Sequence, residues 1–258
     1  MAEPPGSYHG MAWRHSLRWF ETVASLLYPH VCDLCGAERA THRESFLCHR
    51  CRSAPGHLRE VGEVRCGRCG LPQSGAVTGE FVCSNCHGLE LGFDRAVAAV
   101  VATPFLLDVV HRYKYRRALW FEGFLAELLV GVASRVLVGE RWDAVVPVPL
   151  HRIREREREF NQSERLARRM ASALGLPLRT DLVERRSETR SQALLDRGER
   201  AKNVAGAFSR RSSVCLEGWR VVVVDDVLTT GATTSAVGWV LREAGAAEVT
   251  VLTVARGI

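Results

Sequence analysis

The residues VVVVDDVLTTGATT, at positions 221–234, decide the fold of this 258-residue chain. Its first four residues, Val221 to Val224, predict a central parallel β-strand that is buried on both faces, because no polar residue interrupts them. Asp225 and Asp226 follow at the carboxyl end of the strand, where open α/β sheets bind their ligands. Two adjacent carboxylates are costly to place there without a partner. The stretch therefore predicts a strand that presents two acids to a ligand.

The loop TTGAT at 229–233 leads into a helix that we expect from about Thr234 to Ala244, ended by Gly245. Small residues let backbone N–H groups approach an anion, hydroxyl groups add donors, and a helix N-terminus favours negative charge. An acidic N-cap in an ordinary βα loop is the alternative interpretation. The combination of the acid pair with this loop favours a phosphate site instead.

The segments on either side alternate between strand-like and helix-like patterns. We expect a strand at 97–101, a helix at 118–138, a strand at 143–148, a helix at 163–174 and a last strand at 249–254. Strands that alternate with helices predict an α/β fold in which helices flank a parallel sheet.

Eight of the nine cysteines form four CxxC pairs before residue 87. Twelve residues separate the first two pairs and thirteen separate the last two, so successive pairs supply four thiolates at the spacing of a closed tetrahedral zinc site. We expect two structural zinc ions, bound by pairs taken in order along the chain, although the spacing leaves crossed pairing open. The expected ligands are Cys32, Cys35, Cys48, Cys51, Cys66, Cys69, Cys83 and Cys86.

Other uses of these cysteines are disfavoured. A disulfide framework does not suit the reducing cytoplasm in which we expect this chain. Four evenly repeated knuckles favour zinc over an iron–sulfur cluster. His30, His49 and His87 lie beside the knuckles and are expected at the surface or behind the ligands rather than on the metal.

The composition is that of a globular protein in which basic residues outnumber acidic ones. The net charge of +6 and the pI of about 9.0 favour partners rich in phosphate. Lysine occurs only at Lys114 and Lys202, and arginine, which suits bidentate phosphate contacts, supplies the other cationic side chains. A genome-wide bias toward arginine codons is the favoured explanation of this preference. No apolar run approaches the roughly 18–20 residues of a membrane span.

The segment 13–27 places Trp13, Leu17, Phe20 and Leu27 on one face of a predicted helix. We expect this helix to pack on the cysteine module or on the core. A helix that binds a membrane surface or a partner protein is the alternative.

The stretch at 221–234 resembles the signature of the type I phosphoribosyltransferases, and residues 97–256 resemble the ComF/GntX branch of that family. The cysteine module also fits this branch, as a double zinc ribbon. The resemblance implies an N-terminal helical segment (1–28), a double zinc ribbon (29–90) and a phosphoribosyltransferase-like domain (91–258). The further matching pieces are Lys114-Tyr115, Pro147-Val148-Pro149-Leu150, Phe160-Asn161-Gln162, Gln192, Glu199-Arg200, Asn203-Val204, Gly206-Ala207-Phe208 and Ala255-Arg256.

The resemblance implies a ligand, 5-phosphoribosyl-1-pyrophosphate with Mg²⁺, and roles for individual residues. Asp225 and Asp226 would bind the ribose 2- and 3-hydroxyls. Arg200, Lys202 and Asn203 would belong to a loop that closes over the ligand. The 5-phosphate would lie on Thr229, Thr230, Gly231, Ala232 and Thr233, and the pyrophosphate beside Pro147, Val148 and Pro149.

Four arginines follow the proline segment and could neutralise pyrophosphate: Arg152, Arg154, Arg156 and Arg158. Because they alternate with glutamates, a solvated face with internal ion pairs is an equal alternative. The chain also departs from the family here, with Glu159 where the family has a glycine. Glycine would allow positive φ, whereas glutamate restricts the backbone and repels a nearby phosphate.

Two functions fit these features. The first is a phosphoribosyltransferase that displaces pyrophosphate from C1 of the ribose, with an acceptor that the sequence does not identify. The second is a non-catalytic DNA-uptake factor that binds single-stranded DNA and other uptake proteins, as the resemblance to ComF proteins implies. Tyr113 and Tyr115 lie among basic residues and could stack on bases, although burial in the core is the favoured role. A metabolic accessory role has no distinguishing residue, and the oligomeric state is not predicted.

Overall fold

The computed structural model describes residues 30–73, 81–187 and 206–258. The expectations for the N-terminal helix at 13–27 and for the closing loop with Arg200, Lys202 and Asn203 fall outside these residues.

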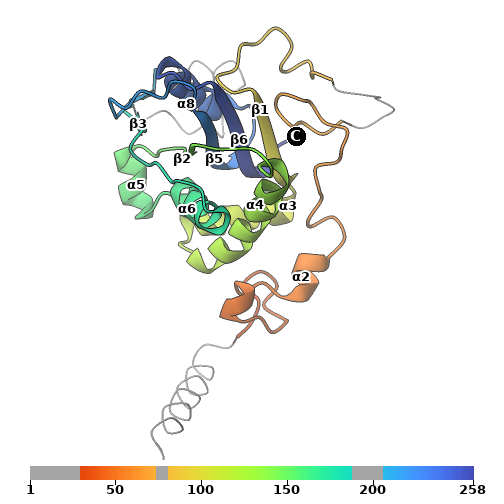
Figure 1. Ribbon diagram of the computed structural model, residues 1–258. Coiled ribbons are helices and arrows are strands. Elements are labelled where there is room, and N and C mark those ends of the chain that lie inside the picture. The colour runs from red at the N-terminus through yellow and green to blue at the C-terminus, as the bar shows by residue number, and fades with distance from the viewer. Residues whose placement is uncertain (1–29, 74–80, 188–205) are drawn as a thin grey trace, which may run out of the picture.

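A four-stranded sheet lies at the centre of the molecule (Figure 1). Its strands run in the order β1-β6-β5-β2, and each neighbouring pair is parallel. They are β1 (Arg95–Val101), β2 (Ala144–Pro147), β5 (Arg220–Leu228) and β6 (Glu248–Arg256). The predicted parallel α/β fold is confirmed.

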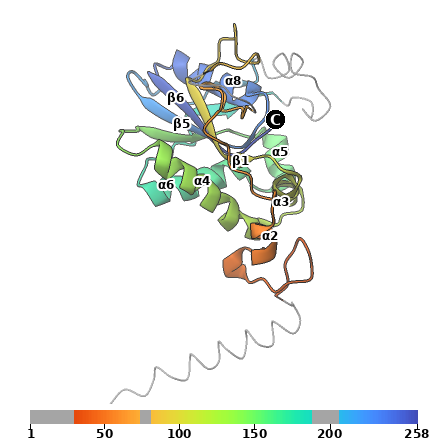
Figure 2. The same cartoon turned by 90° about the vertical axis from the view of Figure 1, so that its right-hand side faces the viewer.

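Helices cover both faces of the sheet (Figure 2). On one face, α3 (Pro104–Tyr115), α4 (Glu122–Val136) and α6 (Gln162–Leu174) share a hydrophobic core with the strands. On the other face, α8 (Ala232–Glu243) packs on the sheet. The smaller elements are η1 (His42–Glu44), α2 (His49–Ser53), η2 (Leu119–Phe121), α5 (Arg152–Arg158) and the antiparallel pair β3 (Val183–Arg185) and β4 (Phe208–Arg210).

The valines of β5 explain why this strand is central. Val222 and Val224 belong to the core under α4 and α6, whereas Val221 and Val223 belong to the core under α8. Both faces of the strand therefore need apolar side chains, as the uninterrupted run predicted.

The structure differs from the expected elements in three places. α3 was not predicted, and it begins at Pro104 because proline suits the first helical turn and the Thr103 hydroxyl accepts the Leu106 N–H at 3.2 Å. β5 continues to Leu228 and pairs with β6 along this length, so Asp225 and Asp226 lie within the strand rather than after it. The helix after the loop begins at Ala232, two residues before the expected start.

The eight cysteines of the CxxC pairs form two groups of four, taken in order along the chain, which settles the pairing that the spacing left open. Within each group the ligand atoms lie within 4.8 Å of one another. The Sγ atoms of Cys32 and Cys51 are 3.8 Å apart, and those of Cys69 and Cys83 are 3.6 Å apart. Zn–S bonds of about 2.3 Å at tetrahedral angles require about 3.8 Å. Both groups therefore fit structural zinc, and the histidines expected behind the ligands belong to neither group.

The segment that follows the second cysteine group crosses α8 in backbone contact. A Cβ added at Gly238 would lie 2.3 Å from the Gly92 carbonyl oxygen, and one added at Gly92 would lie 2.2 Å from the Ser235 carbonyl oxygen. The Gly92 N–H also donates to the Ser235 hydroxyl at 2.9 Å. The crossing therefore requires glycine on both sides.

We expect Gly238→Ala to lower the free energy of unfolding by about 1–3 kcal/mol, because the new methyl group forces the backbone of residue 92 away from α8. Gly131→Ala is the matched control, since it lies inside α4 with nothing within 4 Å of the added Cβ. That variant should instead raise the free energy of unfolding by about 0.5–1 kcal/mol. Urea unfolding of both variants measures the difference, and an equal response of the two would contradict the close crossing.

Candidate functional site

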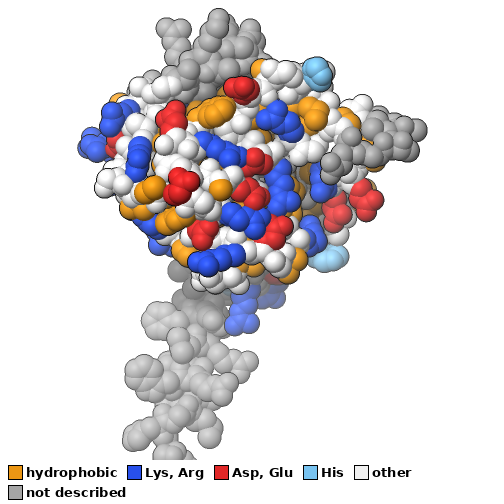
Figure 3. All heavy atoms as spheres, turned by 45° about the horizontal axis from the view of Figure 1, so that its top comes forward, with side chains coloured by type: hydrophobic (Ala, Val, Ile, Leu, Met, Phe, Trp, Pro, Cys, Tyr) orange, Lys and Arg blue, Asp and Glu red, His pale blue; other side chains and the backbone are white. Residues whose placement is uncertain are grey.

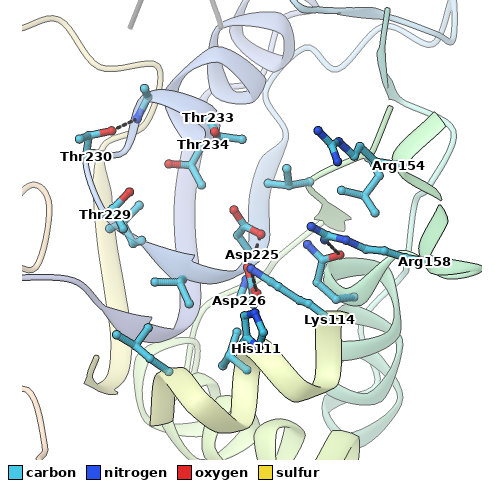
Figure 4. Close-up of a pocket in the computed structure, with 18 of the residues that line it drawn as sticks. His111, Lys114, Arg154, Arg158, Asp225, Asp226, Thr229, Thr230, Thr233 and Thr234 are labelled. Atoms are coloured by element: carbon cyan, nitrogen blue, oxygen red, sulfur yellow. Dashed lines mark hydrogen bonds and ion pairs between the residues drawn. The ribbon is translucent and has the colours of Figure 1, made fainter. Parts of the chain in front are cut away.

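A cleft of about 680 Å³ opens at the carboxyl ends of the sheet strands (Figure 4). One wall comes from α3, the opposite wall from α5 and the loop before it, and the floor from the end of β5. The loop 229–231 and the first turn of α8 close the remaining side. The cleft thus occupies the position where parallel α/β sheets bind ligands.

The acid pair lies on the floor of this cleft. The Asp226 side chain is buried, with 3% of the residue exposed, and it forms an ion pair with Lys114 of α3. Asp225 is half-buried and reaches the open space of the cleft. Its Oδ1 accepts the Ser163 hydroxyl at 2.7 Å and the Asp226 N–H at 2.9 Å. α3, through Lys114, and α6, through Ser163, therefore hold the two carboxylates of β5 in place.

Burial raises the pKa of the Asp225 carboxyl to about 7, and the adjacent charge of Asp226 acts in the same direction. The ammonium of Lys114 and the hydroxyl of Ser163 oppose this rise, because both stabilise the ionised form. Asp225 therefore changes its charge near neutral pH, as perturbed groups at ligand sites commonly do.

The expected phosphate loop lies beside the acids. Gly231 has a φ of +81° and is the N-cap of α8, a conformation that a side chain would strain. The Thr230 hydroxyl accepts the Ala232 N–H at 3.4 Å, whereas Thr229 is exposed. The structure brings all five expected residues, Thr229 to Thr233, to the edge of the cleft around the N-terminus of a 12-residue helix.

The expected pyrophosphate segment is divided between two pockets. Val148 lines the cleft, whereas Pro147 and Pro149 line a separate, smaller pocket of about 270 Å³. The amide of Asn161 holds the segment by donating to the Val148 carbonyl at 3.1 Å. Asn161 also caps α6, since its side chain accepts the Ser163 N–H at 3.0 Å.

Two of the four arginines of α5 line the cleft. Arg154 and Arg158 lie one helical turn apart on the inner face, while Arg152 and Arg156 are exposed and do not line it. Arg158 donates to the Gln162 side chain at 2.9 Å and to the Tyr115 hydroxyl at 3.0 Å. The alternative of internal ion pairs also holds in part, because Arg154 pairs with Glu157 at 3.0 Å.

Glu159 occupies the position where the family has glycine, and it adopts the left-handed conformation with a φ of +66°. Its carboxylate pairs with Arg117 at 2.8 Å and is not among the described groups that line the cleft. The expected backbone restriction is therefore overcome by the local fold, and the charge points to Arg117 rather than to the cleft.

Sequence reasoning missed the wall that α3 forms, because that helix was not predicted. Leu107, His111 and Tyr115 follow at intervals of four residues and line the cleft together with Lys114. This spacing was the available sign of a helical face. The two tyrosines have different environments: Tyr113 is fully buried, as favoured, whereas Tyr115 is 59% exposed.

The α/β domain and the cysteine module each match a known protein family. Residues 161–258 match the family model of the phosphoribosyl transferase domain, and residues 23–87 match that of the double zinc ribbon domain. In the described ranges, no helix combines the length and apolar composition that crossing a membrane requires.

The chain resembles characterised relatives along most of its length. It is 30% identical over 226 residues to Competence protein F of Haemophilus influenzae, covering 82% of this chain and 97% of the relative. It is 32% identical over 232 residues to DNA utilization protein YhgH of Salmonella typhimurium, covering 88% and 96%. Competence protein ComFC of Bacillus subtilis is 28% identical over 232 residues, covering 84% and 89%. The chain therefore belongs to the ComF family, in which a double zinc ribbon precedes a type I phosphoribosyltransferase domain.

Proposed function

We propose that the cleft binds 5-phosphoribosyl-1-pyrophosphate with Mg²⁺. The observation that carries the proposal is the placement of an anion-binding helix N-terminus beside two carboxylates, with two arginines on the opposite wall. A ligand that fits this arrangement has a phosphate group at one end, hydroxyl groups in the middle and a second anionic group at the other end. The phosphoribosyl pyrophosphate molecule has these groups in this order.

Each group of the ligand has a matching group in the cleft. The 5-phosphate would lie on the N–H groups and hydroxyls of 229–233, where the helix dipole of α8 favours negative charge. The ribose hydroxyls would donate to Asp225 and Asp226. The pyrophosphate would face Arg154 and Arg158, whose guanidinium groups can bind phosphate oxygens in pairs.

The carboxylates also fit the cation. Mg²⁺ binds carboxylate and phosphate oxygens and usually keeps several waters. Asp225, which reaches the open space of the cleft, would bind it together with the pyrophosphate of the ligand. When bound, Mg²⁺ would neutralise charge on the leaving pyrophosphate.

The reaction that this arrangement favours is displacement of pyrophosphate from C1 of the ribose by an acceptor nucleophile. The C1–O bond breaks as the bond from the acceptor to C1 forms, and pyrophosphate leaves with the electron pair. The two carboxylates would offset positive charge that develops on the sugar ring, while the arginines hold the departing anion. The protein thus acts through positioning and electrostatics.

Binding of single-stranded DNA is a second candidate function, favoured by one observation on α3. Tyr115 is 59% exposed, its ring lies 4.9 Å from that of His111, and the Arg158 guanidinium lies 4.7 Å from its centroid. Exposed aromatic rings next to arginines are typical stacking sites for unpaired bases. The names of the relatives, Competence protein F and DNA utilization protein, agree with such a partner. On the face shown in Figure 3, acidic and basic side chains are intermingled, which favours a local contact over a broad basic surface.

We expect calorimetric titration of the zinc-loaded protein with phosphoribosyl pyrophosphate and Mg²⁺ to show binding that the Asp225→Asn/Asp226→Asn variant loses. The variant removes the acceptors for the ribose hydroxyls and the carboxylate ligand of Mg²⁺. Asp143→Asn is the matched control, since Asp143 accepts the Arg220 N–H at the opposite end of the sheet and should not affect affinity. Absence of binding by the unaltered protein would refute the proposed ligand.

The affinity for phosphoribosyl pyrophosphate should rise with pH across the range around pH 7. The raised pKa means that the Asp225 carboxyl is protonated, and unable to bind Mg²⁺, as the pH falls through about 7. Ser163→Ala removes a hydrogen bond that lowers this pKa, so its affinity curve should move to higher pH. Titration of the ligand's own phosphates is common to both proteins. An unmoved curve in Ser163→Ala would contradict the assignment to Asp225.

Binding of single-stranded DNA should weaken about tenfold in Tyr115→Ala, because one base–aromatic stack contributes about 1–3 kcal/mol. Fluorescence anisotropy of a labelled oligothymidylate measures this change. Trp239→Ala is the matched control, as Trp239 is 41% exposed on α8 and does not line the cleft. Equal affinity of Tyr115→Ala and the unaltered protein would exclude Tyr115 as a stacking site.

A further inference from the structure

We propose that the second cysteine group positions the phosphate loop through Arg256, so that zinc at Cys66, Cys69, Cys83 and Cys86 sets the affinity for the 5-phosphate. The proposal rests on the proposed function of the loop 229–233. It gives Arg256 the role of a positioning residue that touches the metal centre on one side and the loop on the other.

Arg256 is the last residue of β6 and is buried, with 4% of it exposed. On one side its guanidinium donates to Cys69, at 2.8 Å to the carbonyl oxygen and at 3.3 Å to Sγ. On the other side it donates to the carbonyls of Leu228 and Thr229, at 3.1 Å and 2.7 Å, and also to that of Gly257. A single side chain thus connects a zinc ligand with the first residues of the phosphate loop.

The charge of Arg256 explains why this connection depends on the metal. Arginine stays protonated in proteins, and a buried charge is costly unless it is paired. In the described part of the chain, no carboxylate forms an ion pair with Arg256, and its acceptors are carbonyls and the Cys69 sulfur. A zinc ion with four thiolates has a net negative charge and fixes the position of Cys69. Thiolates on zinc accept such outer hydrogen bonds, which in turn orient the ligands.

The residues that follow the second cysteine group support the same loop from another side. Phe93 is 1% exposed, and its ring lies 3.5 Å from the Cβ position of Gly231. Its neighbour Gly92 is hydrogen-bonded to Ser235 in the first turns of α8. Loosening of the second group therefore affects two contacts with the loop.

The first cysteine group is in contact with a different wall of the cleft. Arg112 of α3 donates to the Asp33 carbonyl at 2.5 Å, between Cys32 and Cys35. The Thr103 hydroxyl, at the start of α3, donates to the His57 carbonyl at 2.6 Å. The two groups can therefore be separated by experiment, since only the second has the Arg256 connection.

The test uses the full zinc-loaded chain and ribose 5-phosphate, a ligand whose phosphate binds the loop. Cys86→Ser should lose the zinc of the second group, so that the unaltered Cys69 is no longer fixed by the metal, and the Kd of this variant for ribose 5-phosphate should rise about tenfold. Cys35→Ser is the matched control, because it should lose the zinc of the first group, which contacts α3 rather than the phosphate loop, and should therefore lose less affinity than Cys86→Ser. A metal-indicator assay confirms which variants have lost half of their zinc.

Variants of Arg256 show whether the effect passes through this residue. Arg256→Met should weaken binding about tenfold with zinc still bound, and Arg256→Lys, which keeps the charge, should restore part of the loss. Cys86→Ser added to Arg256→Met should weaken binding by less than the sum of the two single losses, because the Arg256 contact is already gone and only the contact through Phe93 and Gly92 is left to lose. Arg220→Met, at the opposite end of the sheet and paired there with Glu248, is the control for loss of an arginine in general. An additive double variant, or equal losses in Cys86→Ser and Cys35→Ser, would overturn the proposal.

The rate of backbone amide hydrogen exchange at residues 228–234 tests the role of Arg256 without any ligand. Faster exchange in Cys86→Ser and Arg256→Met, but not in Cys35→Ser, supports it, and unchanged exchange refutes it. If the unaltered protein binds neither ribose 5-phosphate nor phosphoribosyl pyrophosphate, the proposed function fails, and the exchange result still decides the role of Arg256. If Cys86→Ser does not fold, the exchange rates of residues 228–234 in Arg256→Met and Arg256→Lys still show whether Arg256 holds the phosphate loop.

Discussion

The ion pair between Lys114 and Asp226 is the interaction on which the cleft depends. A carboxylate that is almost fully buried at the end of an apolar strand requires a cation nearby, and α3 supplies it. The pair fixes α3 against β5 and so creates the wall that faces α5. The same helix contacts the first cysteine group two residues earlier, through Arg112. The metal module, the wall and the acids thus form one connected structure.

The sequence predicted the sheet and the floor of the cleft because both follow from local patterns. An uninterrupted valine run can only suit a strand buried on both faces, and four CxxC pairs can supply two closed metal sites. The acid pair and the loop 229–233 were found for the same reason, as consecutive residues with an unusual composition. The structure places them together at the cleft.

The walls were predicted less well than the floor, because their geometry depends on contacts between distant residues. The start of α3 at Pro104 becomes clear only once the structure shows that Thr103 caps this helix. Arg154 and Arg158 cannot be separated from Arg152 and Arg156 until α5 is known to be a helix with one inner face. Arg256 was found only as part of the matching piece Ala255-Arg256, and its role could not be predicted because it depends on a contact with Cys69, 187 residues earlier.

The position of β6 has a consequence for how the chain matures during synthesis. This strand is made last of the four, yet it lies between β1 and β5 and pairs with both. While a ribosome is still extending the chain toward β6, β1 has no neighbour in the sheet and the hydrophobic faces around it stay open. The metal knuckles need only local residues and can close early, whereas the sheet must wait for a distant segment to insert into its middle. Nascent chains therefore pass through a stage with finished zinc sites and an unfinished core, which is the stage most exposed to aggregation and to chaperone binding.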